Sequence, residues 1–173
     1  MKITTRQLIL VAFFAALTAL GAWLRIPLQP VPITLQVFFT LLAGAVLGPF
    51  LGALSQLIYL LLGFIGLPIF AGGSYGIGAL WGPTGGYLLG FVAAAYLVGF
   101  LVKRFNLRSL LFIFVSMLAG LFIIYLLGTF QLMIVLNLTI YKALAVGIFP
   151  FVAFDLVKAL LAALVAQRLQ KLI

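Results

Sequence analysis

The chain has 173 residues, of which 67% are hydrophobic and only 6% are charged, and its mean hydropathy is +1.43. So apolar a composition excludes a water-soluble domain and indicates a compact unit of several spans in lipid. The sequence has no cysteine, no histidine and one acidic residue, which excludes thiolate and imidazole metal sites, disulfides and paired-carboxylate catalysis. No stretch has the spacing of a phosphate-binding P-loop. We therefore expect neither an enzyme nor a resident metal or cofactor.

In chain order, the apolar runs predict six transmembrane helices in an all-α membrane protein, with residues 1–173 as one domain. A span needs about 20 apolar residues, and the two shorter runs meet at "LGPFLG", residues 47–52, which we interpret as a tight hairpin. The seven prolines fall at the expected boundaries, where a missing amide donor costs least. The expected helices cover residues 7–24, 33–47, 50–65, 85–102, 109–136 and 151–170.

The cations predict the orientation. The formal net charge of +9 does not indicate a nucleic-acid partner, because the cations lie at the ends of apolar runs and not on one face. With the N-terminus inside, the cytoplasmic ends carry Lys2, Arg6, Lys103, Arg104, Arg108, Arg168 and Lys171, and the outside carries Arg25 and Lys142. This asymmetry follows the positive-inside rule and predicts that both termini are cytoplasmic.

Two alternatives to this topology stay open. A five- or seven-helix division of residues 132–150 would put Arg168 and Lys171 outside. The first run also follows two cations, as a signal peptide does, but it is longer than the usual ~7–15-residue core and leads into a polytopic chain. We interpret it as a retained helix.

A glycine-rich segment at residues 66–90 holds nine of the eighteen glycines and is expected outside. Glycine at this density prevents a continuous helix and lets backbone approach a ligand closely. Short helices interrupted by glycine and proline, such as those expected at residues 33–65, indicate transporter binding sites. Tyr75, Trp81 and Tyr87 lie in the segment and fit either an interfacial belt or ligand stacking.

Asp155, the only acidic residue, precedes Lys158 by three positions at the start of the last apolar run. Residues i and i+3 share a helix face, so the two charges are expected to be neighbours. One interpretation is a neutralising pair, which reduces the insertion cost of about 2.5–3.5 kcal/mol per charge. The other is a ligand site, which we favour because ionisable residues inside a membrane are functional by default.

Small residues recur at a spacing of four in the first run. Ala12 and Ala16 form one such step, and Ala15 and Ala19 form another. This spacing permits the close approach of a second helix. Internal packing and docking onto another protein are both compatible with it.

Four blocks resemble the BioY family, the biotin-specific S components of energy-coupling-factor (ECF) vitamin transporters. They are "PVPITLQ" at 30–36, "LGPFLGALSQLIYLLLGFIGLPIFAGGSYG" at 47–76, "GPTGGYLLGF" at 82–91 and "PFVAFDLVKALLA" at 150–162. The resemblance covers nearly the whole chain in order. It implies the ECF S-component fold, with six helices in the bacterial cytoplasmic membrane, and capture of biotin at the outer face beneath a lid at residues 66–84.

The resemblance also implies partners and site residues. A transmembrane coupling (T) subunit would dock on the alanine steps of the first helix and join the chain to two ABC-type ATPases, which use the ATP. The Asp-x-x-Lys of the last helix, the polar position after the double glycine and the tyrosine of "GGY" would contact biotin, together with neighbours in the same blocks. The expected substrate contacts are Asp155, Lys158, Ser74, Tyr87, Gly73, Tyr75, Trp81 and Gln36.

Biotin suits such a site because its apolar bicycle carries a few polar groups. We hypothesise that Asp155 accepts from the ureido N–H groups while Lys158 meets the carboxylate or the ureido oxygen. Some family members have asparagine at the position of Ser74, arginine at that of Leu88, and Pro-Gly where this chain has Ala153-Phe154. Leu88 leaves Lys158, with Arg25 as a distant second, to pair with the carboxylate. The alternatives are an S component for another small vitamin, a ligand-free structural or pore-forming protein and, least favoured, a lipid-modifying enzyme.

Overall fold

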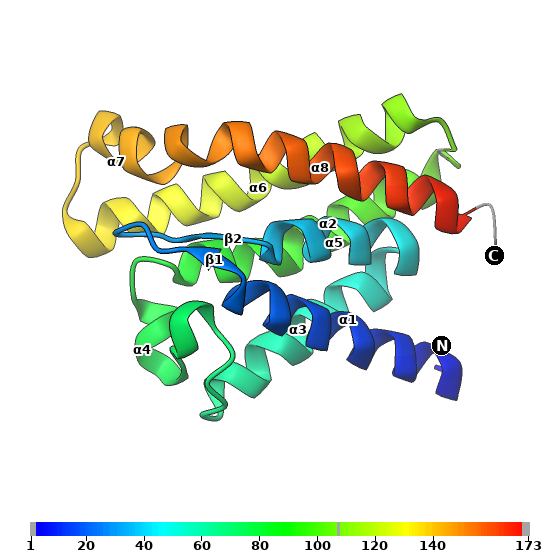
Figure 1. Cartoon of the computed structure of the whole chain (residues 1–173), viewed down its shortest axis with the longest axis horizontal. Coiled ribbons are helices and arrows are strands. Elements are labelled where there is room, and N and C mark those ends of the chain that lie inside the picture. The colour runs from blue at the N-terminus through cyan, green and yellow to red at the C-terminus, as the bar shows by residue number, and fades with distance from the viewer. Residues whose placement is uncertain (1–2, 107, 171–173) are drawn as a thin grey trace.

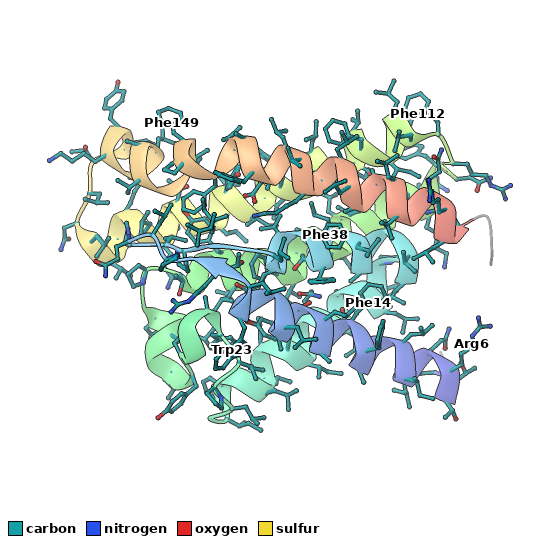
Figure 2. The ribbon with its side chains drawn as sticks, viewed as in Figure 1. Arg6, Phe14, Trp23, Phe38, Phe112 and Phe149 are labelled. Carbon is teal, nitrogen blue, oxygen red and sulfur yellow. The ribbon has the colours of Figure 1, made fainter. Side chains whose placement is uncertain are left out.

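The computed structural model describes residues 3–106 and 108–170, which form a bundle of roughly parallel and antiparallel helices (Figure 1). Helix α1 begins and helix α8 ends at the same end of the bundle, where Arg6 also lies (Figure 2). The predicted charge asymmetry relies in part on Lys2 and Lys171, and both lie outside the described residues.

The elements follow one another with short connections. They are α1 (Thr5–Trp23), β1 (Arg25–Ile26), β2 (Ile33–Thr34), α2 (Gln36–Leu47), α3 (Pro49–Phe64), the 3-10 helix η1 (Ala71–Gly73), α4 (Gly76–Trp81), α5 (Gly85–Arg104), α6 (Leu110–Leu136), α7 (Ile140–Gly147) and α8 (Phe149–Gln170).

Local sequence explains where several helices begin and end. Helix α1 starts at a capping box, in which the Thr4 hydroxyl accepts from the Gln7 amide and the Gln7 side chain accepts from the Thr4 amide. The hairpin between α2 and α3 turns at Gly48, whose φ of 80° favours glycine, and Pro49 opens α3 where its missing donor costs nothing. Asn137, in the left-handed conformation, ends α6.

Helix α5 lies at the centre of the packing, against α2, α3 and α6. Its Ala94, Ala95 and Val98 are fully buried. Helices α2 and α5 approach each other closely at Gly44, where an added Cβ would collide with the carbonyl oxygen of Ala95, so only glycine fits. By contrast, aromatic side chains such as Phe112 and Phe149 project from the bundle surface (Figure 2) and are more than half exposed, as expected for side chains that face lipid.

Six transmembrane helices were predicted, whereas the described residues form eight α-helices in all. The additional helices, α4 and α7, are only 6 and 8 residues long. Because a membrane span needs about 20 apolar residues, run length does not predict helices this short. Within the part of the chain that the structure describes, four helices are long and apolar enough to cross a membrane: α1, α5, α6 and α8. Helices α2 and α3, with 12 and 16 residues, are shorter, so a six-span topology is not confirmed.

A two-stranded antiparallel ribbon was also not predicted. It pairs Arg25 with Thr34 and Ile26 with Ile33, so the expected helix at residues 33–47 begins instead with a strand. The proline-rich turn between the strands folds the chain back on itself, so that residues seven and nine positions apart can pair. The length of an apolar run does not reveal such a turn. The ribbon, η1, α4 and α7 all lie at the end of the bundle opposite the start of α1 (Figure 1), and the candidate site lies there.

Candidate functional site

A cavity of about 50 Å³ lies at this end of the bundle. Helices α2, α5, α6 and α8 form most of its wall, which consists mainly of aliphatic and aromatic side chains. Two non-helical segments complete the wall: the loop that contains the β1–β2 ribbon, residues 24–35, and the start of the glycine-rich segment. The lining residues are Val31, Pro32, Thr34, Gln36, Val37, Phe70, Ala71, Thr84, Tyr87, Leu88, Phe91, Ile124, Tyr125, Phe151, Asp155 and Lys158.

The charged end of the cavity is the ion pair on α8. Lys158 Nζ lies 2.7 Å from Asp155 Oδ1, and both residues are less than a tenth exposed. Lys158 Nζ also donates to the carbonyl oxygen of Thr34 at 2.7 Å, and the Tyr125 hydroxyl donates to Asp155 Oδ2 at 2.7 Å. Burial of two charges is costly unless further hydrogen bonds satisfy them, and here β2 and α6 supply those bonds.

The pair still has unused hydrogen-bonding capacity. An ammonium has three donors, of which Lys158 uses two. An ionised carboxylate has about four acceptor sites, and Asp155 uses one on each oxygen. One donor and up to two acceptors, side by side, therefore remain at the cavity wall, an arrangement that can bind a neutral group with adjacent N–H and C=O functions.

A buried hydrogen-bond chain joins the two non-helical walls. The Thr34 hydroxyl donates to Gln36 Oε1 at 2.9 Å, and Gln36 Nε2 donates to the Tyr59 hydroxyl at 2.7 Å. The Tyr59 hydroxyl in turn donates to the carbonyl oxygen of Ile69 at 3.2 Å, and its ring packs edge-on against Phe70 with centroids 5.4 Å apart. Tyr59, which is fully buried, thus holds the glycine-rich segment against the first loop.

The whole chain, residues 1–173, matches the family model described as the BioY family. The chain belongs to the BioY family. It is 50% identical over 167 residues to the biotin transporter BioY of Thermotoga maritima, covering 96% of this chain and 97% of that one. It is 46% identical over 165 residues to the probable biotin transporter BioY of Pyrococcus horikoshii, covering 95% of this chain and 96% of that one.

A solved structure agrees with this assignment. The crystal structure of the S-component for biotin from an ECF-type ABC transporter superposes with a TM-score of 0.91 at 29% identity, covering 98% of this chain and 95% of that chain. The all-α membrane fold predicted from the resemblance is therefore confirmed as the ECF S-component fold. With four membrane-capable helices, this BioY member is a multi-pass membrane protein.

The fold of this BioY chain brings only some of the predicted contacts to the cavity. Asp155, Lys158, Tyr87 and Gln36 line it, and the Tyr87 hydroxyl donates to the Gly147 carbonyl oxygen at 2.7 Å. The other four predicted residues are not among its lining residues. Ser74 is exposed and donates to the Ala71 carbonyl oxygen, Gly73 has a φ of 76°, and Tyr75 and Trp81 are 60% and 74% exposed.

Sequence reasoning missed several wall residues. Tyr125 binds Asp155 directly, yet it lies thirty residues earlier in the chain. It is the only tyrosine in the run 109–136, and a single tyrosine within so apolar a helix is a signal that was available. The aromatic residues Phe70, Phe91 and Phe151 had no comparable signal, because phenylalanine is spread throughout this BioY sequence.

The alanine steps of α1 point in two directions. Ala12 and Ala16 are exposed on the outer face of the helix, whereas Ala15 is buried and Ala19 is half-buried against the bundle. The first pair therefore leaves a shallow, accessible strip on this BioY chain, and the second pair packs internally.

Proposed function

We propose that this chain captures biotin in the cavity beside Asp155 and Lys158 and carries it across the bacterial cytoplasmic membrane as the S component of an ECF transporter. The observation that carries the proposal is the buried ion pair with a spare donor and spare acceptors at an aromatic cavity wall. The names of the relatives, biotin transporters and a biotin S-component, support the choice of ligand.

The ureido group of biotin matches the spare hydrogen-bonding capacity. It presents an N–H beside a C=O, so the N–H donates to Asp155 while the C=O accepts the third Lys158 donor. The ligand adds no charge to the pair there, and the desolvated carboxylate and ammonium keep each other as counterions. The apolar bicycle packs against the aromatic wall that Tyr87, Phe91 and Phe151 provide.

Energy for uphill transport comes from partners in this proposal. The chain has no P-loop, so in this proposal it serves as the transport subunit, without a cofactor of its own, and leaves ATP hydrolysis to its partners. Two ABC-type ATPases hydrolyse ATP and act through a T subunit. The exposed Ala12–Ala16 strip of α1 is the docking surface for that subunit, because small residues allow a partner helix to approach closely.

The test of the proposed function is equilibrium binding of radiolabelled biotin to the purified protein in detergent, with unlabelled biotin, thiamine, riboflavin and lipoate as competitors. Saturable binding displaced only by biotin is expected. Displacement by a different vitamin would replace the proposed ligand, and the absence of saturable binding in folded protein would contradict capture altogether.

Bulky residues on the α1 strip should separate transport from binding. In the double substitution Ala12→Leu and Ala16→Leu, we expect biotin affinity to be unchanged and ATP-dependent uptake in reconstituted vesicles to fall about tenfold or more, since the partner helix can no longer approach. Ala145→Leu, at an exposed position of α7, is the matched control. Native uptake by the double variant would contradict the docking role.

The Tyr59 hydroxyl should slow the release of biotin. Tyr59→Phe keeps the edge contact with Phe70 but removes the bonds to Gln36 and Ile69. With about 0.5–1.5 kcal/mol per bond, we expect dissociation about tenfold faster in a chase of bound labelled biotin. Tyr96→Phe, on the outer surface of α5 against Phe100, should release biotin at the native rate. Equal rates for Tyr59→Phe and the native protein would refute the bridging role.

A further inference from the structure

The ion pair leaves the carboxylate tail of the ligand without a cation. Lys158 already binds Asp155 and the Thr34 carbonyl oxygen, and its third donor goes to the ureido oxygen in the function proposed above. The charge of Lys158 is also balanced by Asp155, so the pair as a whole does not attract a second anion. The remaining wall is neutral, and Leu88 is a buried, apolar part of it.

Two other cations lie at this end of the bundle among the described residues, Arg25 and Lys142. Lys142 is exposed on α7, and no residue of α7 lines the cavity. Arg25 is also exposed, but it belongs to β1 and pairs directly with Thr34 of the cavity wall. Directly opposed residues of an antiparallel pair project their side chains from the same face of the ribbon. Arg25 therefore shares a face with Thr34.

The Arg25 guanidinium lies where the two non-helical walls meet. It sits directly against Gly72, where an added Cβ would collide with it, and Gly72 follows Ala71 of the cavity wall. The Trp23 ring lies 3.9 Å from the position that a Cβ on the next residue, Gly73, would take. The guanidinium thus lies at the boundary between the ribbon loop and η1, here called the seam. Its neighbours there, Thr34 across the ribbon and Ala71 next to Gly72, both line the cavity.

We propose that Arg25 binds the ligand carboxylate at this seam, which makes it the residue that selects for an acidic tail. The inference rests on the proposed capture of biotin. The guanidinium has no anionic side chain of its own, because Asp155 is the only acid in the chain and is paired with Lys158. Its planar fork matches a carboxylate in a bidentate way, and it is always charged. A tail that extends from the ureido ring toward the seam places its carboxylate there.

The test compares biotin with biotinamide, which has the same ureido ring and tail but no charge, by calorimetric titration. In the native protein we expect biotin to bind roughly 10- to 100-fold more tightly, as for a charge-assisted bidentate contact. In Arg25→Gln, the affinity for biotin should fall to about that for biotinamide. The affinity for biotinamide should stay at its native value, which shows that the rest of the site is intact. Arg25→Lys should retain part of the preference.

Lys142→Gln is the matched control and should keep the native ratio of the two affinities. An unchanged ratio in Arg25→Gln, or native protein that does not distinguish the two ligands, would overturn the inference while leaving biotin capture in place. If Lys142→Gln abolished the preference for biotin over biotinamide and Arg25→Gln did not, the carboxylate contact would belong to α7, and the inference would again be overturned. Failure of the native protein to bind either ligand would instead contradict the proposed function.

Discussion

Replacing Asp155 with asparagine is expected to weaken biotin binding by about 2–5 kcal/mol, or roughly 1.5 to 3.5 orders of magnitude. The substitution keeps the shape of the side chain but removes the counterion of Lys158, which is 7% exposed and has no other acid to pair with. It also places an amide N–H₂ where the carboxylate accepts from Tyr125 and where we place the ureido N–H.

Calorimetric titration of biotin into the purified variant and the native protein measures this loss. Thermal unfolding in the same detergent shows whether the variant is folded, and Tyr96→Phe controls for a substitution away from the cavity. Native affinity in folded Asp155→Asn would mean that the ion pair only stabilises the packing of α8 against its neighbours.

The second large effect is on stability, at the contact between α2 and α5. A side chain at Gly44 would run into the Ala95 backbone, which cannot move as a flexible side chain does. We expect Gly44→Val to destabilise the fold by about 3 kcal/mol or more, which lowers the apparent melting temperature by about 6–12 °C at this chain length.

Tryptophan fluorescence during heating measures that shift. Gly78→Ala in α4 is the matched control, because an added Cβ there meets nothing within 4 Å, and its melting temperature should stay within about 2 °C of the native value. A Gly44→Val protein as stable as the native one would mean that α2 and α5 are able to separate without cost.

The long helices could be predicted from the sequence because each depends on local properties. An apolar run of sufficient length predicts a span, and proline and glycine predict its ends, as at the turn of Gly48 and Pro49. The ribbon of β1 and β2 depends on pairing between Arg25 and Thr34 across a proline-rich turn, and α4 and α7 are too short to produce a periodic signal. These elements were therefore not predicted.

The same distinction applies to the site. Asp155 and Lys158 are neighbours because helix geometry places i and i+3 on one face, so the pair could be predicted without a structure. Their partners, the Thr34 carbonyl oxygen and the Tyr125 hydroxyl, come from other elements and meet the pair only through tertiary packing. The exposed positions of Tyr75 and Trp81 depend in the same way on how the glycine-rich segment folds.

The most direct test of the account is a structure of this protein with biotin bound. We expect the ureido ring in the cavity between α6 and α8, with a ureido nitrogen about 2.7–3.2 Å from the Asp155 carboxylate and the ureido oxygen at a similar distance from Lys158 Nζ. A ligand bound elsewhere on the protein, with the Asp155–Lys158 pair untouched, would contradict it.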